Sequence, residues 1–314
     1  MICRVCGSEN INKMFDYKPY QDYEVEVYDC FGCGCRFVPR DPNIYEKLHS
    51  QSSGYSSHDE YAIQAEKLFQ SNAPELKSFL SQIEKNKFVI ETIESFKGIK
   101  NILEIGCSCG YLTSHFIANE YSILGVDVAP SAIKKACEKF GDYFVLSGDK
   151  RIESGAPYDA IYHAGTIGCV DSPIETTIEL LALLRPGGYL VFNAPNRDSC
   201  DYFGVPWVMG TQPPDLVTLF SERFWVDKFG EYGDVTVEIK KAHKYAWPAY
   251  KLQSILNYRP SGKLFNSKSN SEGGVASKPK IVTVVKGFLE LITKLPIFPS
   301  IPADFGLMIV IQKR

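Results

Sequence analysis

Five short apolar runs, separated by helical stretches, fill the middle of the sequence and restrict the folds that this chain can adopt. Strands that alternate with helices form a parallel sheet that helices cover on both faces. Two more strands are expected near residues 230–242 and 305–311, which predicts a doubly wound α/β sheet of seven strands. The five runs are residues 101–105, 122–126, 143–146, 158–162 and 189–193, and the helical stretches between them are residues 111–119, 131–140 and 174–184.

The first run leads into a tight loop of small residues that begins at Gly106 and ends at Gly110. Glycine adopts backbone angles that side chains resist, and it lets the backbone approach a ligand closely. Asp127 ends the next run, about 20 residues downstream, where a carboxylate suits hydrogen bonds from ribose hydroxyls. The loop and the carboxylate together predict a site for a nucleoside cofactor.

Residues in and before the loop distinguish between nucleoside cofactors. A nicotinamide enzyme normally carries Gly-x-Gly-x-x-Gly, whose second glycine makes room for a pyrophosphate. Here Ser108 separates the two glycines, and Glu104 stands at the strand end, where a carboxylate would face a cation. These residues favour a positively charged cofactor without phosphate.

In their order along the chain, these motifs resemble those of class I S-adenosylmethionine (SAM)-dependent methyltransferases, which have a Rossmann-like sheet. The matching segments are residues 103–110, 125–128, 148–149, 158–161 and 184–191. The resemblance implies that the loop lies around the methionyl group, that one acidic residue binds the ribose and that another lies near the adenine amine. In this sequence, those residues are Glu104, Gly106, Cys107 and Gly110 for the methionyl group, Asp127 with Val128 for the ribose, and Asp149 for the adenine.

Two copies of Cys-x-x-Cys-Gly occur within the first 35 residues. Two thiolates separated by two residues on a turn can bind one side of a tetrahedral ion, and the following glycine lets backbone N–H groups point at sulfur. Cys3, Cys6, Cys30 and Cys33 therefore predict a structural Zn²⁺ site in a zinc ribbon, because four ligands leave no open position for catalysis. A redox dithiol and an iron–sulfur cluster are the alternatives. Cys35 is a spare thiol that could replace Cys33 as a ligand, although the symmetric spacing favours Cys33.

The sequence divides into three expected parts. Residues 1–40 form the zinc ribbon, residues 41–97 a helical linker that could fold over the site, and residues 98–314 the methyltransferase domain. An insertion at 243–304 interrupts this domain. Apolar residues at helical spacing over 281–295 predict a helix packed on the domain. A lid over the substrate and a helix on a membrane surface are the alternatives.

The net charge of −3 gives the chain no global positive field that would attract nucleic acid. No apolar run reaches the roughly 20 residues of a membrane span, and no basic-then-apolar leader precedes Cys3. Cysteines outside the ribbon are mostly scattered singly, which argues against a disulfide framework. We expect a cytoplasmic enzyme with a small-molecule acceptor, and the sequence leaves its oligomeric state open.

The whole chain also resembles a narrower group, the zinc-ribbon-bearing methyltransferases of sugar and natural-product pathways. The paired Cys-x-x-Cys-Gly, the Tyr-rich linker and residues 194–221 carry this resemblance. It implies a nucleotide-linked sugar, or a related surface-polysaccharide or natural-product precursor, as the acceptor. Two acid/base positions differ from the group: Asp215 stands where many relatives have histidine, and Ile167-Gly168-Cys169 where they often have Leu-Glu-His.

His163, after the fourth strand, is the expected general base; a histidine hydrogen-bonded within its strand or loop is the alternative. Tyr55, His58 and Tyr61 on the linker are the next candidates, unless they are aromatic residues that face solvent. Two competing functions remain. One is an RNA methyltransferase that binds RNA through the ribbon, and the other is a non-catalytic SAM-binding protein.

Overall fold

The computed structural model describes residues 1–44, 47, 56–208, 211–232, 234–240, 245–246, 300–301 and 306–314. Contacts group the chain into two compact units. Unit 1 comprises Met1–Asp41, Pro195–Phe224 and Lys240–Leu307, and unit 2 comprises Pro42–Ala194, Trp225–Ile239 and Met308–Arg314. Residues 195–224, which the sequence division assigned to the methyltransferase domain, thus group with the N-terminal ribbon.

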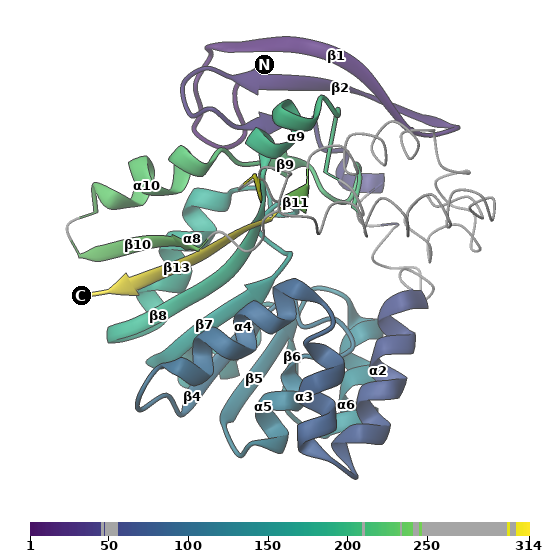
Figure 1. Cartoon of the computed structure of the whole chain (residues 1–314), viewed down its shortest axis with the longest axis vertical. Coiled ribbons are helices and arrows are strands. Elements are labelled where there is room, and N and C mark those ends of the chain that lie inside the picture. The colour runs from purple at the N-terminus through teal and green to yellow at the C-terminus, as the bar shows by residue number, and fades with distance from the viewer. Residues whose placement is uncertain are drawn as a thin grey trace. The chain divides into compact units, whose positions relative to one another are not determined.

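A seven-stranded sheet forms, as the sequence predicts, with the strand order β10-β13-β8-β7-β4-β5-β6 (Figure 1). The neighbouring pairs from β8 to β6 are parallel. The chain winds outward from β4 in both directions, so the topological switch point, where such sheets bind ligands, lies at the carboxyl ends of the neighbouring strands β4 and β7. The strands are β4 (Asn101–Ile105), β5 (Ser122–Asp127), β6 (Phe144–Leu146), β7 (Tyr158–Ala164), β8 (Leu184–Pro195), β10 (Val235–Lys240) and β13 (Gly306–Lys313).

Helices begin and end where local chemistry favours it. The side chain of Asn72 accepts the backbone N–H of Glu75 and caps one helix at its N-terminus, and Pro74 occupies its first turn. The sequence predicts this interruption of the helical linker around residues 72–74, where proline suits a first-turn position. The helices are α2 (Ser56–Phe69), α3 (Ala73–Leu80), α4 (Glu84–Ser95), α5 (Thr113–Ala118), α6 (Pro130–Phe140), α7 (Lys150–Ser154), α8 (Pro173–Leu183), α9 (Arg197–Phe203) and α10 (Glu222–Gly230).

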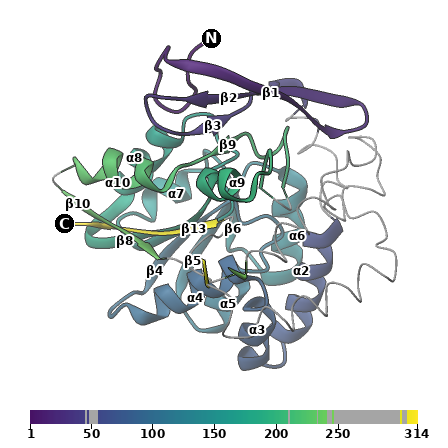
Figure 2. The same ribbon diagram turned by 45° about the horizontal axis from the view of Figure 1, so that its top comes forward.

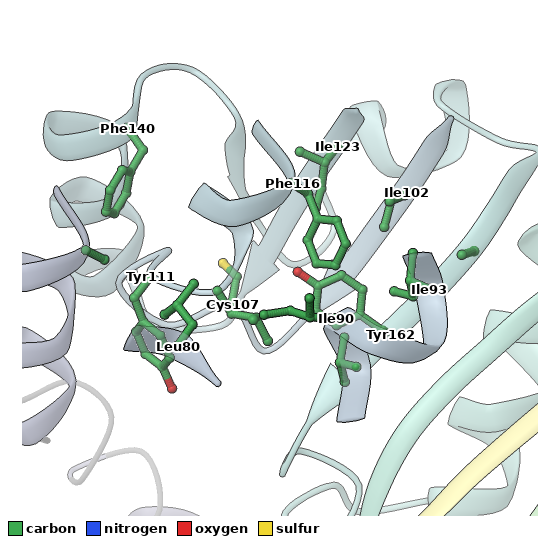
Figure 3. Close-up of a cluster of buried hydrophobic side chains, with 14 of the residues drawn as sticks. Leu80, Ile90, Ile93, Ile102, Cys107, Tyr111, Phe116, Ile123, Phe140 and Tyr162 are labelled. Atoms are coloured by element: carbon green, nitrogen blue, oxygen red, sulfur yellow. The ribbon is translucent and has the colours of Figure 1, made fainter. Parts of the chain in front are cut away.

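One apolar cluster joins helices α2 to α6 to the sheet. Figure 3 shows Phe116 of α5 beside Tyr162 of β7, and the centroids of their rings lie 5.2 Å apart. Helix α2 contacts α6, and the two lie side by side in Figures 1 and 2. Because side chains alternate along a strand, His163 points to the face opposite Tyr162. There the His163 ring contacts Phe192, which in turn contacts Trp225 of α10.

Unit 1 contains a four-stranded sheet of order β1-β2-β3-β9. Valines alternate with glutamates along β2, which is the period of a half-buried strand, and the structure buries Val25 and Val27. Strand β1 was not predicted, although it pairs with β2 along most of its length. The bounds are β1 (Ile11–Tyr20), β2 (Tyr23–Cys30), β3 (Arg36–Phe37) and β9 (Thr218–Leu219), and a separate pair is formed by β11 (Tyr245–Ala246) and β12 (Ser300–Ile301).

The sequence raised two points about membranes: the absence of a membrane span and a possible surface helix at 281–295. In the part of the chain that the structure describes, no helix is long and apolar enough to cross a membrane. The helix expected at 281–295 lies outside the described residues, so its alternatives stay open.

Candidate cofactor site and metal centre

The loop after β4 is held in shape by its own backbone. The N–H groups of Gly106 and Cys107 both donate to the carbonyl of Val126, and the Gly110 N–H donates to the carbonyl of Cys107. The Ser108 N–H donates to a carboxylate oxygen of Asp127 over 2.8 Å. These four N–H groups are therefore engaged within the chain. A pyrophosphate needs free loop N–H groups as donors, so this loop suits a cofactor without phosphate.

Two positions of the loop require glycine for steric reasons that the sequence could not show. Gly106 has a φ of 76°, and a Cβ there would lie 2.2 Å from the hydroxyl oxygen of Thr166. Gly110 has a φ of 78°, and a Cβ there would lie 2.6 Å from the ring of Phe144. Thr166 follows β7 and binds the carbonyl of Ile105, which ties the loops after β4 and β7 together.

Asp127 is fixed by two backbone donors at the carboxyl end of β5. One carboxylate oxygen accepts the N–H of Ser108, and the other accepts the N–H of Ala129 over 2.9 Å. Val128, next to it, is 56% exposed although its side chain is apolar. Asp149 follows β6, the next strand of the sheet, and caps α7 through the Arg151 N–H. The two carboxylates and the exposed apolar side chain thus follow adjacent parallel strands at one edge of the sheet.

Glu104 is 3% exposed and lies at the centre of a buried polar group. The Tyr162 hydroxyl donates to it over 2.7 Å, and the Thr113 hydroxyl donates to the same carboxylate oxygen. Burial raises the pKa of Glu104 from 4.5 to about 7, although both hydrogen bonds oppose this shift. The sequence analysis did not identify Tyr162 and Thr113; the only signal was that Tyr162 and Glu104 lie near the ends of adjacent predicted strands, where they pair in register.

The first turns of α2 lie against the loop. His58 Nδ1 is 2.9 Å from the Ser108 hydroxyl oxygen, and its ring contacts that of Tyr111. Asp59 forms an ion pair with Lys135 of α6, with an N–O distance of 2.7 Å, and accepts the Cys109 thiol over 3.4 Å. The structure therefore places part of the expected linker beside the cofactor loop.

Comparison with known proteins decides the family. A family model described as "Methyltransferase domain" matches residues 61–248, which is more than half of the chain. The chain belongs to this methyltransferase family. The match confirms the resemblance to class I SAM-dependent methyltransferases that the motifs carry.

Curated relatives agree over part of the methyltransferase domain. A ubiquinone biosynthesis O-methyltransferase from Roseobacter denitrificans is 31% identical over 115 residues, 35% of this chain and 46% of the relative. A malonyl-[acyl-carrier protein] O-methyltransferase from Anoxybacillus flavithermus is 31% identical over 99 residues, 30% of this chain and 38% of the relative. The chain spans about half the length of the first curated relatives that it matches. A SAM-dependent methyltransferase from Archaeoglobus fulgidus, of known structure, has 19% identity and a TM-score of 0.38 over 80% of this chain and 99% of its own.

His163, the expected general base, is buried on the face of the sheet opposite Tyr162. His163 is 1% exposed, and within the described part of the chain neither ring nitrogen has a hydrogen-bond partner. Burial lowers its pKa to about 3. Its side chain points to the sheet face opposite Tyr162, the partner of Glu104. The geometry therefore argues against His163 as the base, because strand alternation directs it into an apolar layer.

Of the two tyrosine candidates for the base, the structure describes Tyr61. Tyr61 packs against the apolar cluster, and its ring lies 5.4 Å from that of Phe79 and 5.9 Å from that of Tyr111. Tyr55 lies outside the described residues. His58 is the candidate that the structure places against the cofactor loop.

Four cysteines of the methyltransferase's ribbon form a compact group. The sulfur atoms of Cys3, Cys6, Cys30 and Cys33 all lie within 4.8 Å of one another. The Cys3–Cys33 sulfur distance is 3.8 Å and the Cys6–Cys30 distance is 3.6 Å. A tetrahedral zinc ion with Zn–S bonds of about 2.3 Å separates its sulfur ligands by about 3.8 Å. The cysteine geometry therefore fits a zinc ion, and Cys35 is buried beside this group without belonging to it.

Proposed function

We propose that this protein transfers the methyl group of SAM to an oxygen atom of a small molecule. One observation carries the proposal. The Asp127 carboxylate is fixed by two backbone donors, and it lies beside a loop in which the N–H groups of Gly106, Cys107, Ser108 and Gly110 are already hydrogen-bonded within the chain. Such a site accepts ribose hydroxyls and offers nothing for a phosphate. The family match and the order of the seven strands support the same cofactor.

The residues at the sheet edge fit the parts of SAM. Asp127 would accept the ribose hydroxyls, the exposed Val128 would pack on the nucleoside, and Asp149 would lie near the adenine amine. The pKa of Glu104 is about 7, so a positively charged group beside it would favour the ionised carboxylate. Gly106, Cys107 and Gly110 would shape the surface around the methionyl group, while their N–H groups stay engaged. When bound, SAM would supply a methyl group on a positively charged sulfur. The sulfur is the leaving group when the acceptor oxygen attacks the methyl carbon in line.

The protein's own contribution is alignment and the removal of a proton. Alignment of the acceptor with the sulfur–methyl bond accounts for a large share of the rate in such displacements. A positioned base adds about 10²–10⁴-fold where the acceptor must lose a proton. His58 is the described histidine beside the loop, and histidine is the most common general base in proteins. We therefore propose it as the base in place of His163.

For the acceptor we retain a nucleotide-linked sugar or a related precursor. The names of two curated relatives specify oxygen as the methylated atom, which supports O-methylation here. The proposal of a sugar as the acceptor rests on the resemblance of residues 194–221 to zinc-ribbon methyltransferases. In this segment Trp207 is fully buried and stacks on Tyr17, while Asp215 is half-buried. Asp215 is therefore the better candidate for an acceptor contact.

We assign the four cysteines to a structural Zn²⁺ ion. The set is closed, since four thiolates complete a tetrahedron, and their spacing fits the ion. An RNA-binding role has less support, because the net charge is −3 and Glu24 is exposed on strand β2.

The cofactor assignment is tested by Asp127→Ala. We expect S-adenosylhomocysteine to bind at least about 100-fold more weakly, because a carboxylate that accepts two hydroxyl groups is lost. Isothermal titration calorimetry measures this, with circular dichroism to show that the variant is folded. Glu138→Ala on the exposed face of α6 is the control and should bind as the wild type does. Equal affinity of Asp127→Ala and wild type would refute the assignment.

A further inference from the structure

Ser108 occupies a backbone conformation that its side chain disfavours. Its φ is 51°, and among the described residues only Ser108 and Glu120 combine a side chain with a positive φ. Glycine adopts this conformation without steric cost, and the glycines at both ends of the loop do so. A serine in the middle of the loop therefore calls for a compensating interaction.

The hydroxyl of Ser108 makes such an interaction with α2. Its oxygen lies 2.9 Å from His58 Nδ1, while the backbone N–H of the same residue donates to Asp127 over 2.8 Å. Ser108 thus connects the first turn of α2 to the carboxylate that is assigned to the ribose. A glycine at this position would keep the second contact and lose the first.

The two halves of α2 are held in different ways. Further along the helix, Ala62 and Ala65 are fully buried in the apolar cluster. The first turn is held by polar contacts to the loop and to α6, namely His58 with Ser108 and Asp59 with Lys135 and Cys109. Polar contacts at a helix end resist local opening less than a buried apolar face does. The start of α2 is therefore where a single hydrogen bond affects how firmly the helix covers the loop.

We propose that Ser108 and His58 are a positioning pair, which latches the first turn of α2 onto the cofactor loop and slows release of the bound cofactor. The inference rests on the proposed function, because it takes the loop as the SAM site. It also gives the serine between the two glycines a role of its own. His58 can orient the loop in this way whether or not it also acts as the base.

A double-mutant cycle tests the pair with S-adenosylhomocysteine as the probe. Ser108→Ala keeps the Cβ and removes the hydroxyl, and His58→Ala removes the ring. We expect each variant to release the probe about fivefold faster, which corresponds to ~1 kcal/mol for one hydrogen bond. The double variant should be no faster than either single variant, because both remove the same bond. Stopped-flow fluorescence or surface plasmon resonance measures the rates. Independent, multiplicative effects would overturn the proposal.

Two further variants separate the latch from other roles. Ser108→Gly relieves the backbone strain, so it folds even if Ser108→Ala does not, and it should still release the probe faster. His58→Asn keeps a hydrogen-bonding nitrogen close to the position of Nδ1 and should restore the wild-type release rate. Failure of His58→Asn to restore it, with its fold intact, would contradict a latch through Nδ1.

Hydrogen exchange without any ligand separates failure of the latch from failure of the cofactor assignment. The amides in the first turns of α2 should exchange about fivefold faster in Ser108→Ala and His58→Ala, while those of α4 should not change. Unchanged exchange in α2 would overturn the latch. If exchange rises as expected but the wild type does not bind S-adenosylhomocysteine, the contact stands and the proposed function fails.

Discussion

Two buried titratable side chains, Glu104 and His163, lie on neighbouring strands and have different surroundings. Glu104 keeps two hydroxyl donors at the end of β4, and its raised pKa leaves the carboxyl close to half-ionised near neutral pH. His163 contacts the Phe192 ring and stays uncharged at that pH. Of these two groups, Glu104 is thus poised to respond to a cation, whereas His163 behaves as part of the core.

The pH dependence of stability tests this reading of His163. Its folded-state pKa of about 3 lies below the unfolded value of 6.5, so the unfolded chain binds more protons between these values. The stability that this difference provides is complete above pH 6.5 and is lost as the pH falls, by about 2 kcal/mol at pH 5. In His163→Leu, the fall in the unfolding free energy between pH 8 and pH 5 should be smaller by about 2 kcal/mol. Denaturant titrations at several pH values measure it.

Turnover of the same variant separates core from catalyst. Because the ring lies in an apolar layer, we expect His163→Leu to keep its turnover within about threefold of wild type, whereas loss of a general base would cost about 10²–10⁴-fold. A fall of a hundredfold in a folded variant would return His163 to the role of base.

At the scale of elements, a buried ion network joins α9 to the ribbon strands within unit 1. Asp29 of β2 accepts two hydrogen bonds from Arg36 of β3, at 2.8 and 3.0 Å, and one from Arg197 at the start of α9. Asp201 of α9 pairs with both arginines. Arg197 also donates to the carbonyl of Gly34, in the second cysteine knuckle. Residues 195–221 belong to the segment that carries the resemblance to the narrower group, and they are thus connected to the predicted zinc site.

Removing the central charge of this network should be costly. In Asp29→Asn, two guanidinium groups lose a buried counter-charge, and breaking a buried pair in this way costs about 3–5 kcal/mol. We expect a correspondingly lower free energy of unfolding by denaturant titration. Glu26→Gln is the control, because its ion pair with Lys13 is exposed and should not change the unfolding midpoint. A similar effect of both variants would mean that the network does not stabilise unit 1.

The elements also show how far sequence patterns reach. Strand β4 was predicted with its observed bounds, because a short apolar run between turn signals leaves little choice. Strand β8 is much longer than the predicted run, since it begins at Leu184, which pairs with Tyr158 of β7, and an irregularity in the pairing separates this pair from Tyr189 and Ala160. Strand β1 was missed, although Phe15, Tyr17 and Pro19 alternate with polar residues in its second half. Its first half shows no such alternation and is determined by pairing with β2.

Within the candidate site, too, sequence position predicts some residues but not those that depend on packing. Asp127 could be proposed from its position at the end of the second strand, whereas Asp149 was implied by the resemblance to the methyltransferase family. Thr113 and the contact between His58 and Ser108 depend on how helices pack on the sheet, which spacing does not encode. The role of His163 as the base stays a prediction, because its place in the chain indicates the carboxyl edge of the sheet, while strand alternation directs its side chain to the face opposite Tyr162.

At the scale of the whole molecule, residues far apart in sequence share unit 1. Residues 1–41 carry the four cysteines, and residues 195–224 contribute β9, which pairs with β3 next to Cys35. Because an unfolded chain has no preformed site, the free energy of metal binding becomes free energy of folding for the part of the chain that holds the ligands. Zinc should therefore stabilise residues 195–224 as well as the ribbon itself, although this segment contributes none of the four cysteines.

Removal of the metal tests this coupling in the intact chain. We expect about one zinc per chain by mass spectrometry of the metal, in wild type and in Cys35→Ala, and none in Cys33→Ala. After a chelator has removed the ion, amides of residues 1–41 and 195–224 should exchange faster, while those of β4, β5 and β7 keep their protection. The physical reason is that the four thiolates hold both knuckles together, and the second knuckle holds α9 through Gly34 and Asp29. Faster exchange in residues 1–41 alone would limit the metal to the ribbon, and unchanged exchange throughout would show that the fold does not need it.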